Sequence, residues 1–157
     1  MPLEIERKFL VLGDAWRSAP HRYLCQGYLN RDKARTVRVR IAGEQAWLTV
    51  KGPSSGAVRS EFEYAVPLED ARQMLALCGP PLIEKNRYLV HHEGHTWEVD
   101  EFLGANAGLV VAEIELESET QAFARPAWIG EEVTQHARYF NSNLATHPYS
   151  DWKVEDK

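Results

Sequence analysis

Acidic and basic side chains occupy alternate positions in several segments of the chain. Glu4, Glu6 and Lys8 begin the pattern near the N-terminus. In an extended strand, residues two apart lie on one face at steps of roughly 7 Å. The same spacing recurs at Arg38 and Arg40, at Arg59, Glu61 and Glu63, at Lys85 and Arg87, at Glu98 and Asp100, and at Glu113, Glu115 and Glu117. A single charged residue, Lys51, follows another apolar segment. Carboxylates are ligands of hard ions such as Mg²⁺ and Mn²⁺, whereas arginine and lysine bind phosphate. The pattern therefore predicts a site for a divalent metal and a phosphate-bearing anion.

This charged face could point to solvent, around an ordinary apolar core, or toward the inside of a closed sheet. A solvated face would be expected to mix in Ser, Thr, Gln and Asn, but here acidic and basic pairs occupy one parity in strand after strand. We therefore favour the inward orientation. Eight antiparallel strands enclose an interior about wide enough for one small ligand. Because desolvating charges is unfavourable, such an interior must stay hydrated and its charges must be paired.

The elements that carry these residues are mostly strands, because apolar residues alternate with the charged ones and turn residues separate the segments. We predict strands at 3–12, 23–29, 36–42, 45–51, 59–66, 82–92, 96–102 and 109–117. Short turns at 42–44 and 93–94 favour antiparallel pairing. Helices are expected at 69–78, which ends before Gly79, and at 134–145, with Thr134 as its cap. The expected fold is mainly β (α+β), an eight-stranded antiparallel closed β-barrel with a few flanking helices.

Length and composition indicate one domain over residues 1–152, followed by a disordered tail at 153–157. The net charge of -5 disfavours binding to nucleic acid, and no apolar run approaches the roughly 20 residues needed to cross a membrane. The N-terminus is charged from Glu4 onward and lacks the pattern of a secretory signal, so we expect a cytoplasmic protein. The spacing of Cys25 and Cys78 fits reduced structural thiols.

The segment Glu4-Ile5-Glu6-Arg7-Lys8 resembles the ExExK signature of the CYTH superfamily, the triphosphate tunnel metalloenzymes. The resemblance continues in order along most of the chain, through Arg38-Val39-Arg40, Lys51, Glu61-Phe62-Glu63, Glu84-Lys85-Asn86-Arg87, Glu98-Val99-Asp100 and Glu113-Ile114-Glu115. The C-terminal part, with Gly130 to Thr134, Arg138-Tyr139 and Asn141, is similar to short bacterial members that resemble inorganic triphosphatases. The resemblance implies an eight-stranded antiparallel tunnel and divalent-metal-dependent chemistry on triphosphates.

Carried over by position, the resemblance implies a role for each charged residue. The candidate metal ligands are Glu4, Glu6, Glu113 and Glu115, with Glu61, Glu63 and Asp100 as further acidic candidates. The candidate phosphate contacts are Lys8, Arg38, Arg40, Lys51, Lys85 and Arg87, with Arg59 and Arg138 as additions that could instead form surface ion pairs. The catalytic candidates are Glu4, Glu6, Lys8, Lys85 and Tyr28. Tyr28 shares the parity of Gln26, so its hydroxyl could donate to a phosphate or orient water.

The expected function is hydrolysis of inorganic triphosphate to pyrophosphate and phosphate, with Mg²⁺ or Mn²⁺ as cofactor. Thiamine-triphosphatase, nucleoside triphosphatase and class IV adenylyl cyclase activity are alternatives on the same fold. From a different class, the chain could be a polyphosphate- or nucleotide-binding module without turnover. The expected partner is a small anionic triphosphate, bound by a monomer or homodimer.

Overall fold

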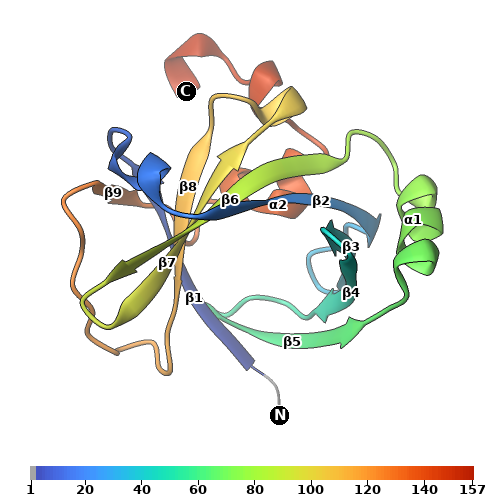
Figure 1. Ribbon diagram of the computed structural model, residues 1–157, viewed down its shortest axis with the longest axis horizontal. Coiled ribbons are helices and arrows are strands. Elements are labelled where there is room, and N and C mark those ends of the chain that lie inside the picture. The colour runs from blue at the N-terminus through green and yellow to red at the C-terminus, as the bar shows by residue number, and fades with distance from the viewer. Residues whose placement is uncertain (1–2) are drawn as a thin grey trace.

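The computed structural model describes residues 3–157, in which nine strands form one antiparallel sheet that closes on itself (Figure 1). The strands are β1 (Leu3–Val11), β2 (His21–Asn30), β3 (Thr36–Ala42), β4 (Gln45–Lys51), β5 (Val58–Ala65), β6 (Ile83–His92), β7 (His95–Phe102), β8 (Val110–Glu115) and β9 (Ile129–Glu132). Their order is β5-β4-β3-β2-β6-β7-β8-β1-β9, and β1 also pairs with β5. The pairing of β1 with β5 closes an eight-stranded barrel, which confirms the predicted fold.

Strand β9 was not predicted from the sequence. It pairs with the C-terminal half of β1, where Phe9 lies opposite Glu132 and Val11 lies opposite Ile129. Its four residues are too few to show a two-residue alternation, so the sequence carries no clear signal for it. Strand β8 ends at Glu115, which leaves Glu117 outside the sheet.

One part of the apolar core lies on the outside of the barrel wall. Phe9, Trp97 and Ile114 alternate with the charged residues of β1, β7 and β8, and each is buried. They belong to one cluster with Trp16, from the 3-10 helix Ala15–Ser18, and with Phe123, from the segment that leads to β9. Because the apolar parity is covered from outside, the charged parity faces inward.

Helix α1 (Leu68–Leu77) covers another part of the wall, beside β3 and β4 (Figure 1). Its predicted bounds, 69–78, were displaced by one residue. Ala71 is buried against Val39 and Ala46 in a separate apolar cluster. Gly27 on β2 permits close approach of the chain after α1, since a Cβ atom there would lie 2.8 Å from the Cβ of Cys78.

The predicted helix at 134–145 was wrong. The region instead contains a 3-10 helix, Ala137–Tyr139, and a short helix α2, Asn141–Leu144, separated by Phe140 in an extended conformation (φ -69°, ψ 135°). Thr134 does not cap a helix, because its Oγ1 accepts a hydrogen bond from the Lys8 backbone N–H at 3.0 Å. That contact continues the pairing of β9 with β1 and delays the start of helix.

This C-terminal segment fills one end of the barrel. Ile83, Phe102 and Val111 share strand parity with charged tunnel residues but are apolar and buried. They form one cluster with Leu144 and Trp152 from the C-terminal segment. The inner face of the barrel is therefore apolar at this end, and the charged residues are confined to the remainder.

The remaining elements are single turns of 3-10 helix at Gly104–Asn106, Tyr149–Asp151 and Val154–Asp156. Disorder of the tail at 153–157 stays a prediction, as does the single domain at 1–152, whose first two residues lie outside the described part of the chain. In residues 3–157 no helix has the length and apolar character required to traverse a bilayer.

Candidate active site

The barrel encloses a cavity of about 230 Å³ whose lining is mostly charged. Fourteen of the sixteen candidate residues from the sequence contribute to this lining: Glu4, Glu6, Lys8, Tyr28, Arg38, Arg40, Lys51, Arg59, Glu61, Glu63, Lys85, Arg87, Glu113 and Glu115. Asp100 and Arg138 are the two that do not. Thr36, Thr49, Glu98, Phe140, Asn141 and Ser142 also line it and had no predicted role.

The strand order separates these charges into two arcs of the wall. Carboxylates come from the neighbouring strands β7, β8, β1 and β5, whereas β4, β3 and β6 supply lysine and arginine around β2. Lys8 on β1 and Arg59 on β5 are the exceptions. The cavity therefore has an acidic side that suits a hard cation and a basic side that suits an anion.

Three carboxylates from the acidic arc are close enough to share one metal ion. Glu6, Glu98 and Glu113 each offer an oxygen, and these oxygens lie within 4.8 Å of one another. Burial, together with the negative charges of Glu113 and Glu4, raises the pKa of Glu6 well above its ordinary value. Burial also opposes ionisation of Glu113, but Lys8, Arg87 and Lys85 outweigh it and lower the pKa of this carboxyl. A cluster that combines a carboxyl of raised pKa with one of lowered pKa suits a divalent cation, which would relieve the repulsion between the carboxylates.

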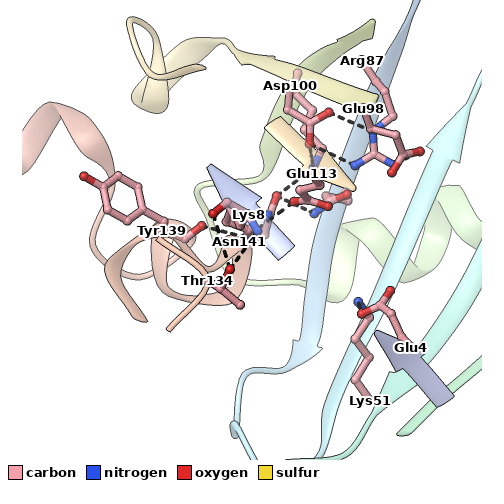
Figure 2. Close-up of polar contacts among 12 residues, drawn as sticks. Glu4, Lys8, Lys51, Arg87, Glu98, Asp100, Glu113, Thr134, Tyr139 and Asn141 are labelled. Atoms are coloured by element: carbon pink, nitrogen blue, oxygen red, sulfur yellow. Dashed lines mark hydrogen bonds and ion pairs between the residues drawn. The ribbon is translucent and has the colours of Figure 1, made fainter. Parts of the chain in front are cut away.

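Glu98 is the metal candidate that the sequence prediction missed, because only Asp100 of this segment was assigned a role. The two residues have the same strand parity, which was the available signal. Glu98 lies opposite Glu113 in the pairing of β7 with β8, and burial raises its pKa. Figure 2 shows Glu98 beside Arg87 and the group around Glu113.

A second acidic group surrounds Lys51, whose Nζ lies 2.8 Å from Glu4 Oε1 and 3.4 Å from Glu61 Oε2. Burial alone would raise the pKa of Glu4, but the Lys51 ammonium outweighs it and the pKa is lowered. Burial and the charge of Glu4 raise the pKa of Glu61 and of Glu115. Glu4 and Lys51 lie apart from the Glu113 group in Figure 2.

The basic arc presents guanidinium groups whose hydrogen bonds are only partly satisfied. Arg38 Nη2 donates to Thr49 Oγ1 at 3.2 Å and lies 3.6 Å from Glu63 Oε2, yet its Nε is buried without a partner among residues 3–157. Burial, with the charges of Arg38 and Arg87 nearby, lowers the pKa of Arg40 to about 9. Arg59 donates to the Gly52 carbonyl at 3.0 Å. An anion in the cavity would satisfy the unpaired donor and offset the mutual repulsion.

Asp100, which the sequence placed among the metal candidates, lies outside the cavity lining. It is 1% exposed and holds two cations, with its carboxylate accepting from Arg87 at 2.8 and 2.9 Å and lying 2.8 Å from Lys85 Nζ. Both oxygens are occupied, so Asp100 supports the basic arc from behind the lining. Burial lowers the pKa of Lys85 to about 7, and Asp100 only partly opposes this shift.

Arg138, the other candidate outside the cavity lining, contacts aromatic side chains. Its guanidinium sits over the rings of Trp152, at 4.6 Å, and Tyr139, at 5.1 Å. Lys8 reaches the same segment from inside the barrel, since its Nζ donates to the Tyr139 carbonyl at 3.2 Å and lies 3.5 Å from Glu113 Oε1. Tyr28 is buried at the apolar end and contributes to the lining.

Comparison with known proteins finds relatives along nearly the whole chain. The family model of the CYTH domain matches residues 2–149. An inorganic triphosphatase of Acetivibrio thermocellus is 52% identical over 155 residues, which cover 98% of this chain and 99% of that protein. An inorganic triphosphatase of Nitrosomonas europaea is 35% identical, over 90% of this chain and 96% of that protein. The crystal structure of an inorganic triphosphatase superposes with a TM-score of 0.66 at 33% identity, covering 90% of this chain and 96% of the other.

Proposed function

This chain belongs to the CYTH domain family, and from that premise we propose that it hydrolyses inorganic triphosphate to pyrophosphate and phosphate, with Mg²⁺ or Mn²⁺ as cofactor. The observation that carries the proposal is one cavity in which an acidic arc of the barrel wall faces a basic arc. The 52% identity to an inorganic triphosphatase over 98% of the chain supports this choice of substrate.

The basic arc binds the phosphates. Triphosphate has charge along its whole length, so it needs several cations in a row rather than one. Arg38, Arg40 and Arg87 offer planar forks that match phosphate oxygens, while Lys51 acts as a point charge. Because phosphoryl transfer needs mainly positioning and charge stabilisation, holding the three phosphates in line contributes directly to the rate.

The acidic arc would hold the metal. Glu6, Glu98 and Glu113 are the first candidates, and Glu4, with Glu61 and Glu115 nearby, could complete the coordination or hold a second ion. When bound, a divalent ion polarises phosphoryl oxygens and lowers the pKa of bound water. The carboxylates themselves fix where the cation sits relative to the basic arc.

We assign to Lys85 the role of accepting the proton of the attacking water. A lysine with a pKa of about 7 is partly neutral near neutral pH, so its Nζ can accept a proton. Asp100 and Asn141 hold this Nζ at 2.8 and 2.9 Å, which fixes its position in the lining. The Tyr28 hydroxyl is available to orient the water or to donate to a phosphate.

The test is phosphate release from triphosphate, ATP, thiamine triphosphate and longer polyphosphate, each with Mg²⁺, with Mn²⁺ and with chelator. We expect triphosphate to be the preferred substrate, and activity to disappear with chelator and return with added metal. Glu6→Gln is the matched negative control. A protein that triphosphate stabilises against heat without any release of phosphate would be a binding module, and the proposal would be wrong.

Cytoplasmic location and a monomeric or homodimeric state remain expectations from the sequence. Size-exclusion chromatography with light scattering would measure the oligomeric state.

A further inference from the structure

Two neutral amides connect a pair of cations in the basic arc. Gln26 on β2 is fully buried, and its Oε1 accepts a hydrogen bond from Arg40 Nε at 2.8 Å. Its Nε2 donates to Asn141 Oδ1 at 3.2 Å, and the same Oδ1 accepts from Lys85 Nζ at 2.9 Å. We call Gln26 and Asn141 the amide relay. It links Arg40 on β3 to Lys85 on β6 across β2 and α2.

The direction of every hydrogen bond in the amide relay is determined by its two ends. Arginine and protonated lysine side chains only donate, so in the protonated form of Lys85 each end must meet an amide oxygen. With its oxygen on Arg40, Gln26 can offer only its NH₂ group to Asn141, which must therefore present Oδ1. Asn141 Nδ2 is left over. Asn141 lines the cavity, and within residues 3–157 no protein acceptor bonds to this Nδ2.

Neutral partners have a specific advantage at this place. Arg40 and Lys85 repel each other and also face Arg87, so without support they would separate. A second carboxylate partner would hold them but cancel more of the positive charge that a phosphate chain needs, since Asp100 already offsets part of the charge of Arg87 and of Lys85. Amide oxygens hold the cations while leaving their net charge in place.

We propose that Gln26 and Asn141 are positioning residues, which set the spacing of Arg40 and Lys85 for one triphosphate, and that Asn141 Nδ2 donates to a bound phosphate oxygen. The proposal rests on the proposed function. The alternative is that Asn141 only anchors the C-terminal segment in the end of the barrel. A purely structural contact would change the melting temperature but not the coupling to Arg40 or Lys85.

A double-mutant cycle distinguishes the positioning role from a purely structural one. Gln26→Leu and Arg40→Ala are measured singly and together, with KM and kcat for triphosphate at saturating Mg²⁺. Removing one hydrogen bond to a charged group should raise KM by about tenfold in the parent background. In the Arg40→Ala background Gln26→Leu should raise it no further, because residues that act through one another are not additive.

Asn143→Ala is the matched control for Asn141→Ala. Both residues lie on α2, but Asn143 Nδ2 donates to the Ala137 carbonyl and so supports only the segment itself. We expect Asn143→Ala to lower the melting temperature and leave KM unchanged, whereas Asn141→Ala should raise KM and lower kcat.

Equal effects of Gln26→Leu with and without Arg40, or equal KM values for Asn141→Ala and Asn143→Ala, would overturn the proposal. If Gln26→Leu does not fold, the cycle is made with Asn141→Ala and Lys85→Met and is read as the dissociation constant for triphosphate by calorimetry. If the parent protein binds triphosphate without releasing phosphate, the proposed function has failed, and the same binding cycle still decides whether the amide relay positions the cations.

Discussion

The substitution Asp100→Asn distinguishes two roles for this residue, as a ligand of the metal or as a support of the basic arc. The sequence placed this residue among the metal ligands, but the structure places it against Lys85 and Arg87 with 1% of its surface exposed. The substitution keeps the size of the side chain and removes its charge. It therefore leaves the buried Lys85 without its carboxylate partner, and leaves Arg87 with only Glu98, at 3.3 Å.

The expected loss can be worked out from this geometry. Breaking a buried ion pair by removing one partner lowers the free energy of unfolding by about 3 to 5 kcal/mol. For a domain of this size each kcal/mol corresponds to roughly 2 to 4 °C, so the melting temperature should fall by about 6 to 20 °C. Lys85 can relieve part of the strain by losing its proton, since its pKa is already lowered to about 7, whereas Arg87 cannot. The loss should therefore be larger at about pH 6 than at about pH 8.5.

The assay is thermal unfolding of the parent and variant without metal at both pH values, together with the Mg²⁺ dependence of triphosphate hydrolysis. Glu98→Gln is the comparison, because this side chain is 36% exposed and Arg87 keeps Asp100 as its partner. We expect Glu98→Gln to change the melting temperature little and to raise the Mg²⁺ concentration required for activity. If Asp100→Asn instead unfolds like the parent and needs more Mg²⁺, then Asp100 binds the metal and the reasoning is wrong.

The remaining predictions concern the acidic arc and Arg138. The pKa of Glu6 is raised well above its usual 4.5, so the neutral form favours folding, and stability without metal should fall as pH rises above about 4.5. Chemical denaturation at saturating Mg²⁺ should show this slope reduced or reversed, and a metal-independent slope would contradict the assignment. Glu6→Gln should raise the melting temperature of the metal-free protein, because it removes a buried like charge, and should abolish turnover; a variant that is active at limiting Mg²⁺ would exclude Glu6 as a ligand. Arg138→Ala should leave KM for triphosphate unchanged and lower stability by about 0.5 to 2 kcal/mol through its lost contacts with Tyr139 and Trp152, whereas a large rise in KM would return Arg138 to the substrate site.

Much of the fold could be predicted because strands carry a strict two-residue period. The alternation of Glu4, Glu6 and Lys8 with apolar residues determines that the three share a face, whatever the strand packs against. The number of such strands and their short turns then favour an antiparallel meander, and all eight barrel strands are present. The charged pairs on one parity predicted most of the cavity lining for the same reason.

The local sequence pattern could not show which role each charged residue of one face has. Glu98 and Asp100 are indistinguishable by parity, and only the pairing of β6 with β7 places Asp100 opposite Arg87 while Glu98 remains in the cavity lining. The helix predicted at 134–145 failed likewise, because the bond from the Lys8 N–H to Thr134 comes from a strand 126 residues away.

The sequence by itself determined which side chains share a face, since that depends on backbone geometry over two residues. The sequence also favoured an inward orientation for this face. Only the tertiary structure decided that its apolar end is closed by the C-terminal segment and that Gln26 and Asn141 join two cations. Those features depend on strand register, on closure of β1 against β5 and on contacts between distant segments. The energies of buried charges depend on such long-range contacts, because each charge is stabilised only by the partners that the closed barrel brings to it.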